Sequence, residues 1–257
     1  MLLAELTAGS AQDAQARSEI VPLDSLERLA TQATPALNAL NFLAPANHIR
    51  VIAEVKRASP SRGQMAEIAD PAQLAHVYES AGASAISVLT EERRFKGSLN
   101  DLRAVRAQVS IPVLRKDFVS LPYQVFEARA AGADIVLLIV AALEQSPLRE
   151  LYSLIGDLGM TALVEAHSAH EVDRAVDLGA RLIGVNARDL NTFELDRDLF
   201  GTVVDRMPAG TIRVAESAVR TVDDVRHYRS AGADVVLVGE ALVTSDARST
   251  LTSFLEV

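Results

Sequence analysis

The sequence predicts an α/β protein, a single (β/α)8 TIM barrel with an N-terminal helical extension. Two observations lead to this fold class. Eight short runs rich in Val, Ile and Leu alternate with segments of helix length, as parallel strands covered on both faces require. Gly-Ala helix ends recur about every 50 residues, or two βα units of roughly 25 residues each, at Gly82, Gly132, Gly179 and Gly232.

The expected elements follow one another without a linker. The strands lie, in chain order, in VIAEVK (51–56), AGASAISVLT (81–90), IPVLRK (111–116), AGADIVLLIV (131–140), TALVEAH (161–167), LGARLIGVNA (178–187), IRVAES (212–217) and AGADVVLVGE (231–240). Eight such units favour a closed barrel over a doubly wound open sheet, which usually has fewer units and whose G-x-G-x-x-G fingerprint the sequence lacks.

The single domain is expected to divide into an extension, residues 1–48, and the barrel, residues 49–257. The extension does not fit the repeat. Within it, LDSLERLATQ (23–32) predicts a helix that covers one end of the barrel, with Asp24 as its N-cap.

The composition excludes several classes of protein. Lys and Arg number 25 and Asp and Glu number 34, for a formal charge of −9, which disfavours nucleic acid and anionic membranes as partners. The absence of Cys excludes disulfides, thiol catalysis, iron–sulfur clusters and thiolate zinc sites. The N-terminus lacks the pattern of a signal peptide, and the longest apolar run, residues 135–143, is too short to span a bilayer. We expect a soluble, cytoplasmic protein.

Charged residues inside the expected strands are candidates for chemistry, because barrel sites form where strands run into their βα loops. Glu54 and Lys56 alternate with apolar neighbours and are expected to point into the barrel mouth. Burial of two charges is unfavourable unless they pair, so a structural ion pair is the alternative. Lys116 and Glu165, at the ends of other strands, favour a functional site.

The last two units indicate a phosphate site. Barrels of this type commonly hold phosphate on loop amides and a short helix N-terminus after strands seven and eight, which here end in Glu216-Ser217-Ala218 and Gly239-Glu240. Ser59 offers a hydroxyl donor from the first strand, and Arg188 adds positive charge.

Two further features receive structural interpretations. His167 follows Glu165 with one residue between them, but no other His ends a strand, so we expect a lone loop imidazole and no metal site. The charge-balanced run Glu91-Glu92-Arg93-Arg94 is interpreted as a mobile loop that closes over the site.

Taken together, these segments resemble indole-3-glycerol phosphate synthases from Asp24 to the C-terminus. The runs that carry the resemblance are AEVKRASPSRG, ISVLTEERRFKGS, PVLRKDF, GADIVLLIVAAL, LVEAH, IGVNARDL, VAES and LVGEAL. The resemblance implies a lyase that closes the indole ring of 1-(2-carboxyphenylamino)-1-deoxyribulose 5-phosphate, with loss of carbon dioxide and water and without a cofactor.

The same resemblance implies a role for each candidate residue. Lys116 resembles the general acid, whose release of a proton we expect burial and Lys56 to assist, and Glu165 the general base. Lys56 is similar to the residue that binds the anthranilate carboxylate, and Glu54 would hold it. The remaining roles are positioning of the substrate by Asn186 and Ser217, phosphate binding by Ser59, Arg188, Ala218, Gly239 and Glu240, and an apolar wall from Phe95 and Phe118.

One position departs from the family pattern. Ala218 stands where the family usually has Gly after Glu-Ser, and Ala resists both a positive φ and a close approach of phosphate to the backbone. We therefore expect weaker phosphate binding than with Gly.

Two other functions stay open from the sequence alone. One is a Schiff-base aldolase acting on a phosphosugar with Lys116 or Lys56 as nucleophile. The other is a non-catalytic barrel that binds a phosphorylated ligand. Association with other enzymes of the tryptophan pathway is also left open.

Overall fold

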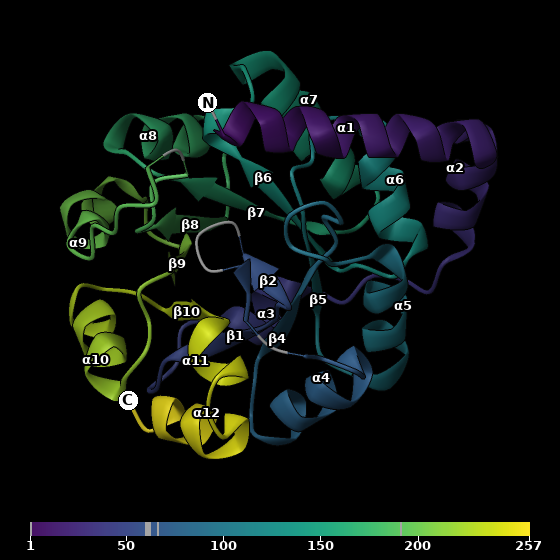
Figure 1. Ribbon diagram of the computed structural model, residues 1–257. Coiled ribbons are helices and arrows are strands. Elements are labelled where there is room, and N and C mark those ends of the chain that lie inside the picture. The colour runs from purple at the N-terminus through teal and green to yellow at the C-terminus, as the bar shows by residue number, and fades with distance from the viewer. Residues whose placement is uncertain (1, 60–62, 66, 191) are drawn as a thin grey trace.

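The computed structural model describes residues 2–59, 63–65, 67–190 and 192–257. Within this part of the chain, eight parallel strands close into a barrel with helices around it, which confirms the predicted fold class (Figure 1). The barrel strands are β1 (Arg50–Val55), β4 (Ala85–Leu89), β5 (Val113–Lys116), β6 (Ile135–Ile139), β7 (Thr161–Ala166), β8 (Leu182–Asn186), β9 (Ile212–Glu216) and β10 (Val235–Val238).

Pairing of the first strand with the last one closes the barrel. β1 pairs in parallel with β4 on one side and β10 on the other, and the remaining strands follow in chain order between them. In this register Ile52 lies beside both Ala85 and Leu237, so that interior side chains of neighbouring strands meet at one level.

Helices follow the strands and cover the outside of the barrel (Figure 1). They are α4 (Pro71–Ser80), α5 (Leu99–Gln108), α6 (Pro122–Ala130), α7 (Gln145–Asp157), α8 (Ala169–Asp177), α9 (Leu199–Val203), α10 (Val222–Ser230), α11 (Glu240–Val243) and α12 (Ala247–Leu255). Single turns of 3-10 helix, η1 (Val140–Ala142) and η2 (Val204–Arg206), and a short hairpin after β1, β2 (Ala58–Ser59) with β3 (Gly63–Gln64), complete this part.

The ends of the helices agree with the sequence signals. Asp70 accepts the amide hydrogens of Ala72 and Gln73 at the start of α4, where Pro71 occupies the first helical position. The four repeated glycines have φ between 76° and 101°, the left-handed conformation that ends a helix before the next strand.

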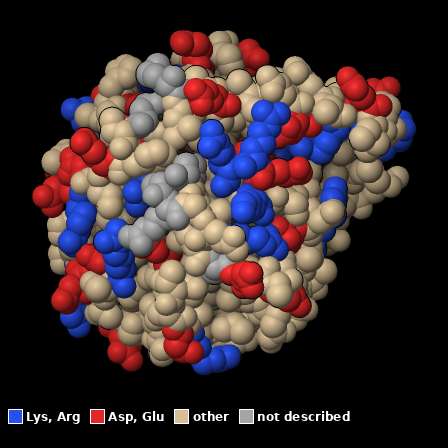
Figure 2. All heavy atoms as spheres, viewed as in Figure 1, with Lys and Arg blue, Asp and Glu red and all other residues tan. Residues whose placement is uncertain are grey.

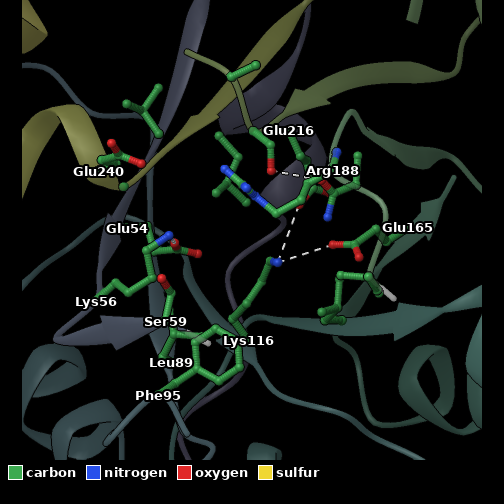
Figure 3. Close-up of a pocket in the computed structure, with 18 of the residues that line it drawn as sticks. Glu54, Lys56, Ser59, Leu89, Phe95, Lys116, Glu165, Arg188, Glu216 and Glu240 are labelled. Atoms are coloured by element: carbon green, nitrogen blue, oxygen red, sulfur yellow. Dashed lines mark hydrogen bonds and ion pairs between the residues drawn. The ribbon is translucent and has the colours of Figure 1, made fainter. Parts of the chain in front are cut away.

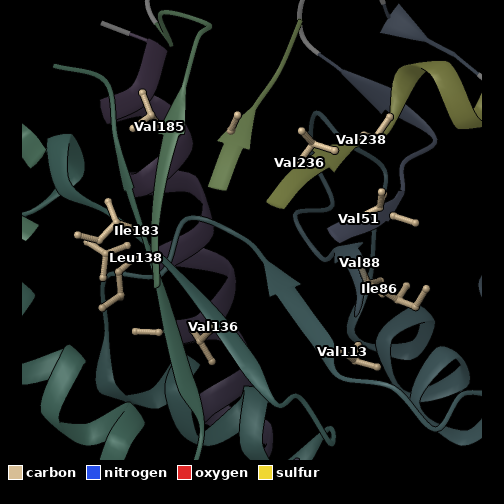
Figure 4. Close-up of a cluster of buried hydrophobic side chains, with 14 of the residues drawn as sticks. Val51, Ile86, Val88, Val113, Val136, Leu138, Ile183, Val185, Val236 and Val238 are labelled. Carbon is tan, nitrogen blue, oxygen red and sulfur yellow. The ribbon is translucent and has the colours of Figure 1, made fainter. Parts of the chain in front are cut away.

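Side chains of each strand alternate between two hydrophobic clusters. Val51, Val88 and Val136 belong to the cluster between the barrel and its helices (Figure 4). Ile52 and Leu137, their immediate neighbours on β1 and β6, belong to the cluster inside the barrel. Both faces are therefore buried, which is why the strands are almost continuously apolar.

The N-terminal extension contains three helices, α1 (Leu2–Ile20), α2 (Leu23–Gln32) and α3 (Ala39–Leu43). The helix predicted at 23–32 is present, but the expectation that Asp24 caps it was wrong: Pro22 is the N-cap, and Asp24 lies in the first turn. The helix packs against α6 on the outside of the barrel, so the expectation that it covers one end of the barrel was also wrong (Figure 1). Helix α1 lies within the predicted helical extension, but no periodic pattern located it, because its apolar residues do not gather on one face. Leu3 and Leu6 of α1 nevertheless join the cluster inside the barrel.

Candidate active site

A cavity lies at the carboxyl ends of the barrel strands, and all the residues predicted for the site line it (Figure 3). They are Glu54, Lys56, Ser59, Phe95, Lys116, Phe118, Glu165, Asn186, Arg188, Ser217, Ala218, Gly239 and Glu240. Residues 60–62, which belong to one of the motifs, lie outside the described residues.

Strand alternation directs the charged side chains into this cavity. Ile52, Leu114 and Leu163 belong to the cluster inside the barrel. Glu54, Lys116 and Glu165 follow them by two residues on β1, β5 and β7 and so point to the same side, toward the barrel mouth.

Glu54 and Lys56 form an ion pair in which the carboxylate is buried and the ammonium half-buried. Oε1 of Glu54 lies 2.7 Å from Nζ of Lys56, and the Ser87 hydroxyl donates to the other carboxylate oxygen at 3.2 Å. Burial alone would raise the pKa of Glu54, but Lys56 and Lys116 outweigh it and hold the pKa below its ordinary value. Glu54 is therefore ionised and fixes the Lys56 ammonium at the cavity.

Lys116 is the cation at the centre of the site. Its Nζ lies 3.1 Å from Oε2 of Glu165 and 3.4 Å from Oε2 of Glu216 (Figure 3). Burial alone would lower the pKa of Lys116, but Glu165, Glu216 and Glu54 outweigh it and raise the pKa above its ordinary value. The expectation that the surroundings ease loss of its proton was wrong, because carboxylates outnumber the neighbouring cation. Lys116 is held as a protonated donor.

Glu165 and Glu216 carry different charges. Burial raises the pKa of Glu216 well above its ordinary value, and the negative charge of Glu165 raises it further. Burial acts on Glu165 in the same direction, but Lys116 and His167 outweigh it and lower the pKa of Glu165. The surroundings therefore favour the neutral form of Glu216 and the ionised form of Glu165, which leaves Glu165 as the base. Sequence reasoning had noted Glu216 as a strand end without assigning it a proton.

Asn186 and Ser217 form one polar unit at the ends of β8 and β9. The Ser217 hydroxyl donates to Oδ1 of Asn186 at 2.7 Å, and the backbone N–H of Arg188 donates to the same oxygen at 3.0 Å. Gly184, two residues before Asn186 on the interior side, is required here because a Cβ at this position would overlap Oε1 of Glu216. Sequence reasoning missed this glycine.

The backbone in the predicted phosphate region is unusual in two places. Ser217 and Ala218 have φ of 69° and 55°, a conformation that side chains disfavour. At Gly239, a Cβ would lie 2.7 Å from Oε1 of Glu54 and 3.1 Å from Nζ of Lys56. A side chain at Gly239 would therefore displace the ion pair.

Phe95 and Phe118 form the predicted aromatic wall, with ring centroids 6.0 Å apart. The loop that carries Phe95 was interpreted from the sequence as mobile, but hydrogen bonds and an ion pair anchor it. Glu91 is only 3% exposed and its carboxylate accepts the backbone N–H groups of Arg93, Arg94 and Phe95 at 2.8–3.1 Å. Arg93 also pairs with Asp13 of α1 at 2.7 Å. The loop is thus held by the Glu91 carboxylate from within and by Asp13 of α1 from outside.

Three further residues belong to the site although the sequence did not assign them to it. His167, interpreted as a lone loop imidazole, contacts Glu165 and Glu171. Leu6 of α1 and Phe193 line the cavity, and no sequence pattern marks either one. Leu6 shows that α1 borders the cavity on one side of the barrel (Figure 1).

The described residues contain no group of three or more His, Asp or Glu side chains that could hold a metal ion. Nor do they contain a helix both long and apolar enough to cross a membrane. On the face viewed in Figure 1, basic and acidic side chains lie interspersed (Figure 2).

Comparisons with known proteins agree with the earlier resemblance. A family model described as indole-3-glycerol phosphate synthase matches residues 3–254. A relative of that description in Leifsonia xyli subsp. xyli is 67% identical over 98% of this chain and 97% of its own length. Another, in Mycolicibacterium vanbaalenii, is 57% identical over 96% of this chain and 91% of its own length.

Solved structures with a similar fold have lower identity. A thiamine phosphate pyrophosphorylase from Pyrococcus furiosus matches with a TM-score of 0.62 at 15% identity, over 85% of this chain and 96% of its own. An N-acetylmannosamine-6-phosphate 2-epimerase from Clostridium perfringens matches with a TM-score of 0.61 at 14% identity and the same coverage. These likenesses concern the barrel fold alone.

Proposed function

The chain belongs to the indole-3-glycerol phosphate synthase family, and from this premise we propose that it is a carboxy-lyase whose acid, base and anion-binding residues lie in the cavity described above. Its activity is that of the family, in tryptophan biosynthesis. Neither an aldolase nor a non-catalytic barrel is favoured by this membership. We propose the cytoplasm as its compartment, because a chain without Cys suits a reducing environment.

The proposed substrate is 1-(2-carboxyphenylamino)-1-deoxyribulose 5-phosphate. It carries a carboxylate, a carbonyl group and a phosphate, and the cavity offers a group for each. The Lys56 ammonium, held by Glu54 at 2.7 Å, suits the carboxylate. Phe95 and Phe118 suit the flat aromatic ring, and Ser59, Arg188 and the loop amides near Ala218 and Gly239 suit the phosphate.

In the first step, Lys116 donates a proton to the carbonyl oxygen while the ring carbon that bears the carboxylate attacks the carbonyl carbon. The new carbon–carbon bond closes the five-membered ring and leaves a hydroxyl group. Loss of carbon dioxide then returns an electron pair to the ring. The raised pKa of Lys116 keeps the donor protonated until an alkoxide of higher basicity develops beside it.

In the second step, the hydroxyl leaves as water with a proton from Lys116, which has been reprotonated from solvent. Glu165 removes the proton from the adjacent carbon of the pentulose chain, and the indole double bond forms. The bond changes balance as one substrate and one proton giving indole-3-glycerol phosphate, carbon dioxide and water. Asn186 and Ser217 position the polar groups of the intermediate.

The observation that carries this proposal is the contact of Lys116 with Glu165 at 3.1 Å, an acid and a base joined in a cavity that also presents Lys56. We expect Lys116→Met to lower kcat by about 10²–10⁴, the usual contribution of a general acid, while the substrate still binds. Indole fluorescence measures turnover directly, because the chain contains no Trp.

The matched control is Lys96→Met, which removes an exposed Lys outside the cavity and should keep the parent rate. A Lys116→Met protein with near-parent turnover would remove Lys116 from the mechanism. Borohydride treatment in the presence of substrate tests the aldolase alternative, since the proposed reaction forms no covalent adduct.

A further inference from the structure

His167 lies between two carboxylates beside the proposed base. Its side chain, on the loop between β7 and α8, is 10% exposed. Nε2 lies 3.4 Å from Oε1 of Glu165, and Nδ1 lies 3.4 Å from Oε2 of Glu171. Each ring nitrogen therefore lies within ion-pair distance of a carboxylate oxygen, although only Nδ1 makes a hydrogen bond, and the two negative charges favour an imidazolium.

Glu171 is fixed by the backbone of the same loop. Its Oε2 accepts the backbone N–H of His167 at 2.8 Å. Its own backbone N–H donates to the hydroxyl of Ser168, the N-cap of α8, at 3.3 Å. The outer carboxylate is thus part of a helix cap, which holds the imidazole at a set position relative to Glu165.

Glu165 in turn lies between two cations. Lys116 contacts Oε2 at 3.1 Å, while His167 faces Oε1 at 3.4 Å. The proposed reaction removes a proton from Lys116 early, and the neutral amine then no longer stabilises the negative charge of Glu165. His167 is the cation that stays beside Glu165 during this stage.

We propose that His167 is a positioning residue that, as an imidazolium held by Glu171, keeps Glu165 ionised and oriented after Lys116 has given up its proton. The inference rests on the proposed function, because it assigns a partner to the proposed base.

The surrounding charges support this role. Burial alone would lower the pKa of His167, but the carboxylates of Glu165 and Glu171 outweigh it and raise the pKa to about 10. The other charged groups that face Glu165 are Lys116 of β5 and Glu216 of β9, and Glu54 of β1 acts on Lys116. With Lys116 neutral, burial would favour protonation of Glu165, and His167 opposes this.

The first test is the pH dependence of kcat in the full chain. His167→Gln keeps a polar side chain but removes the positive charge, so the acid limb of the profile, which reports protonation of Glu165, should move up by about 1–2 pH units. Glu171→Gln should give a smaller shift in the same direction. His170→Gln, which changes an exposed His three residues away, should leave the profile unchanged.

A merely structural His167 would lower activity equally at all pH values. An acid limb that does not move in His167→Gln would therefore overturn the inference, as would a shift of the same size in His170→Gln. Thermal unfolding of each variant, followed in parallel, identifies a loss that comes from unfolding.

The second test does not depend on turnover. Ring C–H resonances of the five His residues can be followed by NMR, and His167 identified by its absence in His167→Gln. We expect its ring to titrate well above pH 8 in the parent chain and at lower pH in Glu165→Gln and in Glu171→Gln. Titration near the ordinary value of 6.5 would overturn the inference even if the synthase activity is present. Absence of synthase activity with a high-titrating His167 would instead contradict the proposed function.

Discussion

At the residue scale, the site contains two Glu and two Lys side chains, and the surroundings of each give it a different charge state or a different ion pair. Glu165 and Glu216 are both fully buried acids, yet Lys116 and His167 stabilise the charge of the first, whereas burial and the first carboxylate keep the second protonated. Lys116 and Lys56 are both cations, but Lys56 is paired with Glu54 at 2.7 Å and Lys116 contacts two acids at longer distances. Position in the cavity assigns the roles.

We predict that the two acids respond differently to amide substitution. Glu165→Gln removes the ionised base and should lower kcat by about 10²–10⁴ with little change in KM. Glu216→Gln resembles the protonated acid that is already present and should keep kcat within about tenfold. Steady-state kinetics on both variants make the comparison. Equal losses in kcat would show that the proton is shared between the two acids.

A second prediction concerns Ala218. Its φ of 55° means that the backbone is already strained in the folded protein without bound phosphate. An L-residue in this conformation costs roughly 1–2 kcal/mol, and the greater freedom of Gly in the unfolded chain offsets about half of it. Ala218→Gly should therefore raise the free energy of unfolding by about 0.5–1 kcal/mol, measured by urea denaturation, and lower KM only slightly.

The control is Ala209→Gly, at an exposed position without a positive φ, which should be neutral or destabilising. A several-fold drop in KM for Ala218→Gly without a gain in stability would show that the strain arises on phosphate binding, as the sequence comparison with the family had indicated.

At the element scale, the segment between β4 and α5 is organised by one buried side chain. The Glu91 carboxylate accepts three consecutive backbone N–H groups, and its own carbonyl oxygen accepts the N–H of Gly97 at 2.9 Å. The loop thereby holds Phe95 against Phe118. From sequence, a run of two acids and two bases was indistinguishable from a solvated surface, because charge alone does not show which acid is buried.

Glu91→Gln is expected to weaken this loop. The amide NH2 of Gln would face backbone donors, so the free energy of unfolding should fall by about 1–3 kcal/mol. Because Phe95 loses its support, KM should rise several-fold with a smaller change in kcat. Glu92→Gln, at the adjacent exposed acid, is the control and should change neither quantity. An unchanged KM in Glu91→Gln would show that Phe95 does not depend on this anchor.

Buried polar contacts also hold helix α1 in place, as the Glu91 carboxylate holds the loop after β4. The Ser10 hydroxyl donates to Oδ1 of Asp117 at 2.7 Å, and Thr90 and Arg115 donate to the other oxygen at 2.6 and 2.9 Å. Asp117 follows Lys116 directly, so the N-terminal helix is joined to the strand that carries the proposed acid.

At the scale of the whole molecule, the buried charges make stability depend on pH in both directions. Glu54, Glu165 and Asp117 have pKa values below their ordinary 3.8–4.5, so the stability they contribute is lost as the pH falls below that range. His167 has a pKa raised from 6.5 to about 10, so its contribution is complete below pH 6.5 and lost as the pH rises toward 10. The raised pKa of Glu216 acts in the same direction as that of His167.

We therefore predict that the free energy of unfolding is greatest near pH 4.5. It falls above this pH because of Glu216, falls more steeply above pH 6.5 because of His167, and falls below pH 4.5 because of the paired acids. Urea denaturation on both sides of this pH measures it. In His167→Gln the free energy of unfolding should fall less between pH 6.5 and 10 than in the parent, whereas His170→Gln should behave like the parent. A parent profile that rises steadily from pH 6.5 to 10 would contradict the proposed charge on His167.

Much of the molecule was determined by the sequence itself. Eight apolar runs with helix-ending glycines specify the barrel, because strands buried on both faces need an apolar side chain at nearly every position. The alternation of side chains along a strand also determined that Glu54, Lys116 and Glu165 meet at one end, since residues two apart share a face.

The tertiary structure alone decided the charge states and the border of the site. The proton on Glu216, the charge of Lys116 and the contacts of His167 depend on distances between strands that are far apart in sequence. Helix α1 has no apolar face of its own, so the place of Leu6 beside the cavity follows only from packing against the finished barrel. Local patterns encode which face a side chain takes, whereas electrostatics and long-range packing arise only when the strands close into a ring.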